Sequence, residues 1–429
     1  MPDSDTIVKV WAREVLNFRG NPTVEAEVSL ADGSFGRVSV PAGISAGASE
    51  VGELLDGEKK RYGGKGVMKA VKNVREIIGP VLTGMHASPQ EAVDKKILEV
   101  EGTPNKSRLG GNAVLSVSLA TAYAAAANKK MPLYKYIGGE GPFRLPVPCF
   151  DLFCGGSHAR DSIDFQEILM IPAGLATFGE ALQSGSAVYQ MIAGILKKKG
   201  YEIGNSSGPL SAPLKSNRES IDLMAEAIEK AGYRLGAQCY IGVDAATSEL
   251  YENGRYVLKS ENRSLTAAEI ADLWEDWVNS YPIISLEDPM SEEDWDNWVM
   301  LTKRLGNRIQ LVGDDFFTSS PVRVKRGIEL GAANAVLIKP NQIGTLTETL
   351  ETVKLAASAG YCCMPSSRSG ETEQTVISDI SVLPECGQIK CGPPSQQSIP
   401  KYNRLLRIEE ELGDKAIYAG KSVFKALNK

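Results

Sequence analysis

The chain has few histidines and lacks any long apolar run. Only two histidines, His86 and His158, occur among its 429 residues. A zinc site made of three histidines is therefore excluded, and any metal must be held mainly by carboxylates. No stretch approaches the roughly 20 apolar residues that span a bilayer, so we expect no membrane partner. The opening residues, MPDSDTIVKV, lack the basic and apolar regions of a secretory signal.

Paired cysteines and an excess of positive charge are also missing. The seven cysteines are scattered and form no C-x-x-C pair. This pattern favours reduced thiols, so we expect a cytoplasmic protein. The formal net charge is −6, which indicates no basic surface for nucleic acid. Lysines and arginines can still gather inside a pocket, so a local anion site remains open.

Length and pattern predict two domains of an α/β protein. A chain of 429 residues with 43% apolar and 23% charged residues is typical of a globular protein that exceeds one ordinary domain. A proline-rich stretch, FRLPVPCF, lies at residues 143–150. We expect a small first domain over residues 1–138 and a larger second domain over residues 139–429.

The first part of the chain has strand patterns followed by helix patterns. Strand-like runs rich in β-branched residues lie at 8–17, 23–30 and 35–43, and helical periodicity follows at 66–82, 88–100 and 111–129. This order favours an α+β domain. In the second part, short apolar runs alternate with helix patterns at 218–232, 265–281, 320–331 and 346–360. That alternation predicts a (β/α)8 barrel, whose catalytic mouth lies at the carboxyl ends of the strands.

Four of the apolar runs end in a charged residue. They are IGVD at Asp244, IISLED at Glu287, IQLVGDD at Asp314 and AVLIK at Lys339. A single aspartate after a strand is usually a turn or helix N-cap residue, an interpretation that suits Asp288 and Asp315. Three carboxylates at neighbouring strand ends are costly without a cation, and oxygen ligands suit Mg²⁺. We therefore expect one or two Mg²⁺ ions at Asp244, Glu287 and Asp314.

Several further residues suit the binding and deprotonation of an acidic substrate. Lys339 is either a salt-bridge residue or, with its pKa lowered beside a metal ion, a general base. Arg368 and Ser369, in SRSGET, offer a fork of donors and a hydroxyl for a phosphate. Lys390, in GQIK, could neutralise a substrate carboxylate or support the metal.

Two other segments carry candidate residues with plainer alternatives. Ser45 lies in the Gly- and Ala-rich loop PAGISAGASE, which could equally be an ordinary turn. His158 lies in GGSHARDSIDFQEILMIP together with Gln166 and Glu167. A lone histidine is more often a structural hydrogen-bonding residue than a catalytic one.

These motifs, in this order, resemble those of the enolase family. The resemblance runs from RGNPTVEAEV through GGNAVLSVSLA, GGSHA, QEILMIPAG, IGVDAATSELY, SLEDPMSEEDW, VGDD, IKPNQIGTLTET and RSGETE to GQIK and KYNRLLRIEEELG. It implies an enolase-type fold, a small α+β domain followed by a (β/α)8 barrel, in a homodimer, with higher assembly left open.

The resemblance also implies a role for each candidate residue. Asp244, Glu287 and Asp314 would hold the first Mg²⁺, and Ser45 would help to hold a second. Lys339 would remove the C2 proton of 2-phosphoglycerate or an analogue. Lys390 would contact the substrate carboxylate, and Arg368 and Ser369 its phosphate. His158, Gln166 and Glu167 would line the pocket, with His158 and Glu167 as further catalytic residues and Gln166 and Ser45 as substrate-binding residues.

The chain departs from the family at two positions. The family carries a glutamate, which helps the C3 hydroxide to leave, in a Gly-Asp-Glu-Gly-Gly loop, and a histidine just before the Arg-Ser pair. Here the loop reads GNSSGPLSAP, which places Ser207 and Gly208 at the glutamate, and Ser367 replaces the histidine. General acids and bases are typically worth about 10²–10⁴-fold in rate. Dehydration should therefore be poor unless Glu167 or Glu50 substitutes, and the pocket should be larger.

Three functions fit this pattern. The retained base and metal ligands favour altered chemistry, as in the carboxyphosphonoenolpyruvate synthases of phosphinothricin-type phosphonate antibiotic biosynthesis, which also use a nucleotide-activated phosphonoformate. The first alternative is phosphopyruvate hydratase, a glycolytic lyase. The second is a non-catalytic binding or structural protein with the enolase fold.

Overall fold

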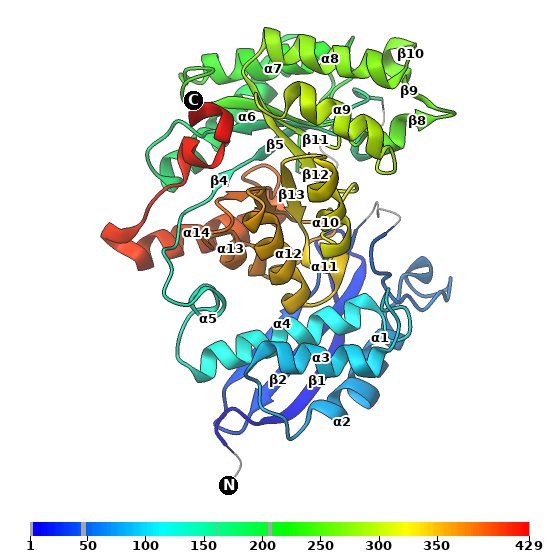
Figure 1. The fold of residues 1–429 in the computed structure, drawn as a ribbon, viewed down its shortest axis with the longest axis vertical. Coiled ribbons are helices and arrows are strands. Elements are labelled where there is room, and N and C mark those ends of the chain that lie inside the picture. The colour runs from blue at the N-terminus through cyan, green and yellow to red at the C-terminus, as the bar shows by residue number, and fades with distance from the viewer. Residues whose placement is uncertain (1–2, 44–48, 160, 205–207, 429) are drawn as a thin grey trace.

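A computed structural model describes residues 3–43, 49–159, 161–204 and 208–428 of the chain. The N-terminal sheet and helices form one end of an elongated molecule, and a barrel with its surrounding helices forms the other (Figure 1). In the described part of the chain, no helix has both the length and the apolar content that a membrane crossing needs.

The N-terminal part contains an antiparallel sheet in the order β1-β2-β3, with β1 at Ile7–Leu16, β2 at Pro22–Leu30 and β3 at Phe35–Ser39. The apolar face of β2 is fully buried against the long helix α4, Gly111–Asn128. Gly36 permits this close packing, because a Cβ atom there would lie 2.1 Å from the carbonyl oxygen of Ala120. All three predicted strands form. The third ends at Ser39, earlier than predicted, just before Pro41, which has no N–H for a ladder.

The predicted helices of this part also form. The segment predicted at 66–82 is α1 at Met68–Asn73, a π-helical turn at Val74–Ile78 and α2 at Gly79–Leu82. Pro80 cannot donate a backbone hydrogen bond, which accounts for the irregular ladder. The remaining helices of this part are α3 at Gln90–Glu101 and α5 at Leu133–Gly138.

In the described part of the chain, nine strands form the barrel, with β4 and β5 as consecutive parts of one run. Seven of them follow the order β14-β13-β12-β11-β7-β6-β5. β15 closes the barrel by joining its two edges. On one side it pairs with β4, which directly precedes β5 in the chain. On the other side a bridge joins Ser366, after β14, to Lys390, after β15. The strand bounds are β4 Val147–Pro148, β5 Phe150–Cys154, β6 Glu167–Ile171, β7 Tyr240–Asp244, β11 Ile283–Glu287, β12 Gln310–Gly313, β13 Ala335–Ile338, β14 Cys362–Pro365 and β15 Gln388–Ile389.

One barrel strand runs against its neighbours. β6 is antiparallel to both β5 and β7, whereas β7, β11, β12, β13 and β14 are mutually parallel. The first residue of β6, Glu167, therefore pairs with the last residues of the flanking strands, Cys154 and Asp244. This reversal brings Glu167 to the barrel mouth, where the other strands present their carboxyl ends.

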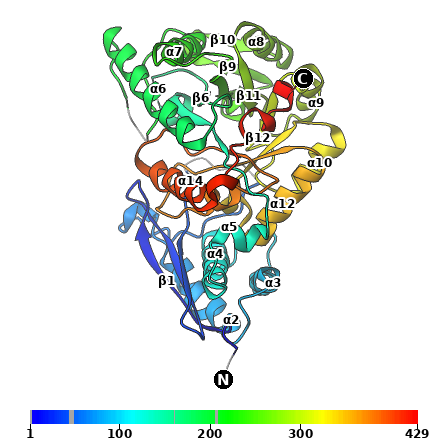
Figure 2. The ribbon, with the colours of Figure 1, turned by 90° about the vertical axis from the view of Figure 1, so that its left-hand side faces the viewer.

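Helices cover the outside of the barrel (Figure 2). Four of them begin at a Thr or Ser whose hydroxyl accepts from the backbone N–H of a glutamate three residues later, at Thr177, Ser216, Thr266 and Thr345. This capping pattern explains where these helices start. The covering helices are α6 Phe178–Lys198, α7 Asn217–Lys230, α8 Ala267–Ser280, α9 Trp295–Leu305, α10 Pro321–Leu330, α11 Pro340–Ile343, α12 Leu346–Ser358, α13 Val376–Ser381 and α14 Ile399–Leu412.

Smaller elements complete the fold. A three-stranded sheet, β8 Tyr251–Glu252, β9 Arg255–Leu258 and β10 Arg263–Leu265, lies beside α8. Short 3-10 turns lie at Tyr62–Gly64, Gly156–His158, Thr247–Leu250, Lys259–Glu261, Gln396–Ser398, Gly413–Lys415, Gly420–Val423 and Lys425–Asn428.

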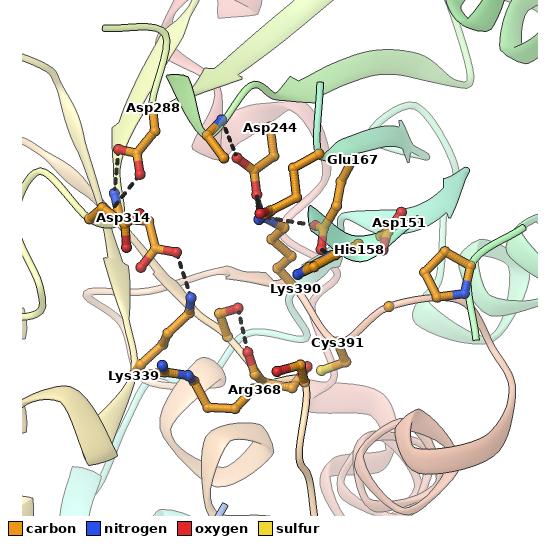
Figure 3. A pocket seen from close by; sticks show the side chains of 18 of the residues that line it. Asp151, His158, Glu167, Asp244, Asp288, Asp314, Lys339, Arg368, Lys390 and Cys391 are labelled. Atoms are coloured by element: carbon orange, nitrogen blue, oxygen red, sulfur yellow. Dashed lines mark hydrogen bonds and ion pairs between the residues drawn. The ribbon is translucent and has the colours of Figure 1, made fainter. Parts of the chain in front are cut away.

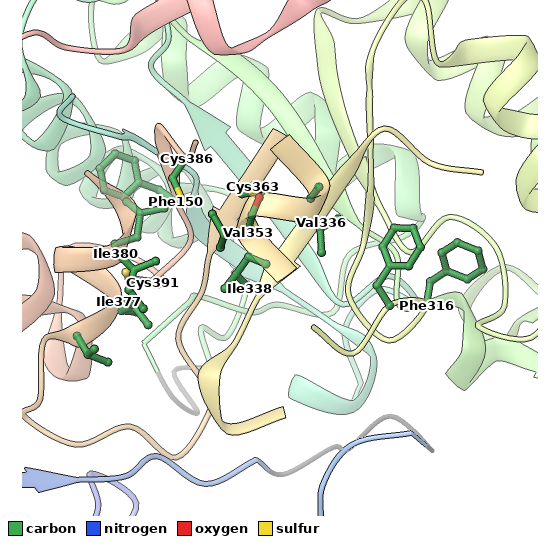
Figure 4. Close-up of a cluster of buried hydrophobic side chains, with 14 of the residues drawn as sticks. Phe150, Phe316, Val336, Ile338, Val353, Cys363, Ile377, Ile380, Cys386 and Cys391 are labelled. Atoms are coloured by element: carbon green, nitrogen blue, oxygen red, sulfur yellow. The ribbon is translucent and has the colours of Figure 1, made fainter. Parts of the chain in front are cut away.

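The apolar core fills the space between strands and covering helices. Figure 4 shows Val336 and Ile338 of β13 packed with Val353 of α12 and Cys363 of β14, all fully buried or nearly so. All seven cysteines are free thiols, and six of them are buried. Burial keeps most of these thiols from reacting.

Candidate active site

Most of the predicted residues meet in one pocket at the barrel mouth (Figure 3). Its volume is about 790 Å³, part of which is open to solvent. The predicted residues that line it are His158, Gln166, Glu167, Asp244, Asp314, Lys339, Ser367, Arg368, Ser369 and Lys390. Glu287 lies directly beneath this lining and contacts Lys390. Ser45 lies outside the described residues, so its predicted metal and substrate contacts stay predictions.

Lys390 lies at the centre of a cluster of three carboxylates. Its Nζ atom is 2.8 Å from Asp244 Oδ2, 2.7 Å from Glu287 Oε1 and 3.0 Å from Glu167 Oε2. Asp244 and Glu287 end the adjacent parallel strands β7 and β11 and are register partners. Burial lowers the pKa of Lys390, but the three neighbouring charges raise it well above its usual value. Lys390 is therefore a permanent cation in the absence of substrate.

Asp314 and its neighbours form a second acidic cluster. In the described ranges, Asp288, Asp314 and Asp315 form the one group of three carboxylates whose oxygens all lie within 4.8 Å of one another. Asp288 accepts hydrogen bonds from the backbone N–H groups of Asp314, at 3.0 Å, and Asp315, at 2.8 Å. It therefore has the structural contact that the sequence suggested. Burial and the charge of Asp314 raise the pKa of Asp315 to about 7.

Lys339 follows β13 and reaches the second cluster. Its Nζ donates to Asp314 Oδ2 at 2.5 Å, and its backbone N–H donates to Ser319 Oγ at 2.8 Å. Burial lowers the pKa of Lys339, but the carboxylate of Asp314 raises it above the usual lysine value. This direction is opposite to the lowered pKa expected beside a metal ion, because here the ammonium itself balances Asp314.

Arg368 is held by residues from distant parts of the chain. One guanidinium nitrogen donates to Glu50 Oε2 at 2.8 Å and to Asn341 Oδ1 at 3.3 Å. Its backbone N–H donates to Glu371, whose carboxylate forms a buried ion pair with Lys401 at 2.7 Å. Arg368 is thus fixed by backbone and side chain alike, next to Ser369 on the pocket wall.

His158 and Glu167 are paired on another side of the pocket. The Nδ1 atom of His158 lies 3.2 Å from Glu167 Oε1, and Gln166 donates to Asp244 Oδ2 at 3.4 Å. Burial lowers the pKa of His158, but the contact with Glu167 raises it above its usual value. Burial raises the pKa of Glu167, but Lys390 and His158 hold it well below the usual range. Glu167 is therefore an ionised group, which argues against its suggested role as a substitute acid.

The donor set of the pocket fits a divalent cation. Three lysine and arginine side chains line it, Lys339, Arg368 and Lys390, against seven carboxyl groups, those of Glu50, Asp151, Glu167, Asp244, Asp288, Asp314 and Asp315. Among the described residues, Glu287 Oε2 is a buried carboxylate oxygen without a hydrogen-bond partner. Excess carboxylates and a free buried oxygen are the features that oxygen-liganded Mg²⁺ requires.

Comparison with known families agrees with this geometry. The model for the enolase N-terminal domain matches residues 7–137, and the model for the enolase C-terminal TIM barrel domain matches residues 142–427. The chain belongs to the enolase family. It is accordingly an enolase-superfamily protein with an N-terminal domain and a TIM barrel. The family typically uses Mg²⁺, for which the aspartate cluster around Asp314 offers oxygen ligands.

The two positions predicted to depart from the family have different surroundings. Ser367 lines the pocket, and its backbone N–H donates to the Lys390 carbonyl at 2.9 Å. Gly208 is buried with φ +121°, and its carbonyl accepts from Tyr189 Oη at 2.6 Å. A Cβ atom at Gly208 would lie 3.3 Å from Pro393 Cγ. Ser207 lies outside the described residues.

Two polar residues that contact or line the site, Gln342 and Asp151, were not predicted from the sequence. Gln342 of α11 donates to Asp314 Oδ1 at 2.9 Å and to Glu50 Oε1 at 3.2 Å, which links the two clusters that hold Lys339 and Arg368. Asp151 of β5 is buried and lines the pocket beside Glu167 and His158 (Figure 3). Its signal was a single carboxylate inside the apolar run CFDLFC at 149–154, which resembles an ordinary buried strand.

Proposed function

We propose that this enolase-family protein is a Mg²⁺-dependent enzyme that removes the C2 proton of 2-phosphoglycerate or a similar acid. The observation that carries this proposal is the position of Lys339, a buried lysine whose ammonium contacts the carboxylate of Asp314 at 2.5 Å. Asp244, Glu287 and Asp314 would hold the metal. When bound, Mg²⁺ would neutralise the charge that accumulates on the substrate carboxylate during deprotonation.

The chain's own cations suit an acid with two negative groups. Lys390 would turn from its carboxylate neighbours toward the substrate carboxylate. Arg368, with Ser369, would exchange its contact with Glu50 for the substrate phosphate, since a guanidinium fork matches phosphate oxygens. Lys339 would lose its proton once a cation balanced Asp314, and would then accept the C2 proton.

For the complete reaction we propose carboxyphosphonoenolpyruvate synthase activity, with a nucleotide-activated phosphonoformate as second substrate. Two facts support this choice. Small residues stand at Gly208 and Ser367, where the family carries two larger side chains, and the pocket of about 790 Å³ is partly open to solvent. The proposed base, Lys339, and the proposed anion-binding cations, Arg368 and Lys390, line the same pocket. A binding protein without catalysis would have no need of a buried lysine placed against a metal-binding carboxylate.

A second candidate is phosphopyruvate hydratase, the dehydration of 2-phosphoglycerate to phosphoenolpyruvate. One observation favours it, which is the presence of a further buried carboxyl group in the pocket at Asp151. Dehydration needs an acid for the departing hydroxide, and Asp151 is a chemically suitable group.

Proton and phosphorus NMR in D₂O with Mg²⁺ would test the proposal. With 2-phosphoglycerate alone, we expect deuterium to enter at C2. Adding nucleotide-activated phosphonoformate should then release the nucleotide monophosphate and give a new phosphorus signal. Rapid phosphoenolpyruvate formation without the phosphonate would instead establish the second candidate.

A lysine variant gives the matched control for this experiment. Lys339→Gln should lose C2 exchange by about 10²–10⁴-fold, the usual worth of a general base. Lys106→Gln removes another buried lysine, whose Nζ lies 3.0 Å from Glu348 Oε1. This lysine lies away from the pocket, so the variant should retain exchange. Absence of C2 exchange in the wild-type protein would refute the proposed deprotonation.

A further inference from the structure

Asp151 is a buried carboxyl group whose hydrogen-bonding capacity is only partly satisfied by its surroundings. Its side chain belongs to β5 and is 3% exposed. In the described part of the chain, its Oδ1 atom is buried without a hydrogen-bond partner. A buried carboxylate normally accepts several hydrogen bonds, so a group left in this state needs a chemical explanation.

Asp151 lies beside Glu167 in the pocket lining (Figure 3). The negative charge of one buried carboxylate disfavours ionisation of a second carboxyl group next to it. Glu167 is held as the ionised partner by Lys390, at 3.0 Å, and by His158, at 3.2 Å. Asp151 is therefore the carboxyl group of the two that favours the protonated form.

The charges around Asp151 act in the same direction. Burial, followed by the charge of Glu167, raises the pKa of Asp151 well above the usual aspartate value. The titratable and charged groups that surround it come from several elements, namely Glu167 of β6, His158 of the 3-10 turn, Asp244 of β7, Lys390 after β15 and the hydroxyl of Tyr402 of α14.

The strand of Asp151 also lies beside the segment that lost the family's glutamate. Leu210 donates its backbone N–H to the Leu152 carbonyl at 3.1 Å, and Cys154 donates to the Leu210 carbonyl at 2.8 Å. Gly208 precedes Leu210 by two residues, and both Pro209 and Asp151 line the pocket. Asp151 therefore reaches the pocket from the strand adjacent to the missing acid.

Asp151 and the proposed base lie apart. Figure 3 shows Asp151 and Lys339 on different sides of Lys390, with Glu167 and His158 on the side of Asp151. An acid and a base that act on two neighbouring carbons need this separation, because otherwise they would exchange the proton directly.

We propose that Asp151 is a further catalytic residue, the acid that donates a proton to the oxygen leaving C3 of the substrate. This proposal rests on the proposed C2 deprotonation by Lys339. The Lys339 amine takes the C2 proton first, and the electron pair of that C–H bond is held as negative charge on the substrate carboxylate. In a second step this electron pair forms the C2–C3 double bond as the C3–O bond breaks. The departing oxygen takes the proton of Asp151 and leaves as water. Asp151 ends as a carboxylate and Lys339 as an ammonium, and one proton exchanged through solvent restores both.

The test separates the two halves of the reaction. Asp151→Asn keeps the size and a hydrogen-bond donor but cannot supply an acidic proton. With 2-phosphoglycerate and Mg²⁺ in D₂O, we expect this variant to keep C2 exchange within a few-fold of wild type. The step that breaks the C3–O bond, followed as enolpyruvyl product with or without the activated phosphonate, should fall by about 10²–10⁴-fold. Unchanged product formation would overturn the proposal, as would an equal loss of exchange and product.

An analogue with chloride in place of the C3 hydroxyl provides a rescue. Chloride leaves without a proton, so Asp151→Asn should eliminate it at nearly the wild-type rate. Failure of this rescue would assign Asp151 to structure and overturn the proposal. Asp94→Asn is the matched control, because it removes another buried carboxyl group of raised pKa, at the α3–α12 contact, and should leave both half-reactions unchanged.

Infrared difference spectroscopy tests the proton without reference to turnover. Wild type at neutral pH should show the carbonyl band of a protonated carboxyl group that disappears in Asp151→Asn, and absence of that band would overturn the proposal. If the band is present but wild type exchanges no C2 proton, the proposed function fails, and the acid role that depends on it fails with it. If wild type exchanges C2 while the variant forms product normally, only the acid role of Asp151 fails.

Discussion

Arg368 and Glu50 form a buried ion pair at 2.8 Å that joins the barrel mouth to the segment preceding the first helices. The two side chains are 5% and 7% exposed. Removing one partner of a buried pair leaves an uncompensated charge, which typically costs about 3–5 kcal/mol. We therefore expect Arg368→Ala and Glu50→Ala each to lower the free energy of unfolding by about that amount, measured by denaturant titration.

The double variant distinguishes pairing from simple loss of packing. Glu50→Ala with Arg368→Ala should cost clearly less than the sum of the two single variants. The exposed pair Arg218–Asp276, with side chains 45% and 56% exposed, is the control and should show a coupling of about 0–1 kcal/mol. Strict additivity at Glu50 and Arg368 would contradict the structural interpretation.

His158 should titrate above the usual histidine range. Burial opposes its charged form, but its contact with Glu167 at 3.2 Å raises its pKa. A histidine with a raised folded-state pKa stabilises the fold fully below the unfolded value of about 6.5, and this contribution is lost as pH rises through the folded value. The difference in unfolding free energy between wild type and His158→Gln should therefore shrink as pH rises above about 6.5.

NMR titration of the imidazole signals measures the cause of this effect directly. The chain has two histidines, so His158→Gln identifies the signals by elimination. Glu167→Gln should lower the pKa of His158 and leave that of His86, which pairs with Asp5 at 2.7 Å, unchanged. An unshifted His158 in Glu167→Gln would rule out Glu167 as the source of the raised pKa.

Mg²⁺ should stabilise the folded protein through Glu287. Its Oε2 atom is buried without a hydrogen-bond partner among the described residues, and burial with the charge of Asp244 raises its pKa well above the usual value. A ligand at 100 times its Kd adds about 2.7 kcal/mol of stability. Wild type should melt at a higher temperature with Mg²⁺ than with a chelator, and Glu287→Gln should lose most of that difference. Asp276→Asn, which removes an exposed carboxylate, should retain it.

The sequence predicted the residues that follow regular strands, and missed those that depend on distant contacts. Asp244 and Glu287 could be recognised because each ends an apolar strand of a parallel barrel. Glu167 reaches the same mouth only because β6 runs in the opposite direction, which strand pattern alone does not specify. The pairing of Glu50 with Arg368 spans 318 residues and leaves no local signal.

Asp151 illustrates a second reason why a site residue can be missed in the sequence. Within CFDLFC the alternation of side chains is hidden by a continuous apolar run, so a carboxyl group that faces a pocket looks like a residue of a buried strand. Its contact with Glu167 depends on the packing of β5 against β6. The barrel helices that were predicted, in contrast, lie within a few residues of their predicted bounds, because Thr and Ser caps and amphipathic periodicity are local features.

Gly208 should resist any substitution, which bears on attempts to restore the family's glutamate. Its φ of +121° is rarely adopted by other residues, and an added Cβ would press on Pro393 at 3.3 Å. Gly208→Ala should therefore lower the free energy of unfolding by about 1–3 kcal/mol, measured by denaturant titration. Gly194→Ala is the matched control, because it lies within α6 with open space around it and should gain about 0.4–1 kcal/mol.

The same strain predicts the result of rebuilding the lost acid site. Gly208→Glu combined with Ser367→His should not raise phosphoenolpyruvate formation from 2-phosphoglycerate, because the glutamate cannot occupy the present backbone without moving Pro393 or the segment that pairs with β5. Ser367→His alone meets no such backbone constraint and should fold with near wild-type stability. A strong gain of dehydration in the double variant would show that the backbone at Gly208 rearranges readily, and that the acid was lost by side-chain replacement alone.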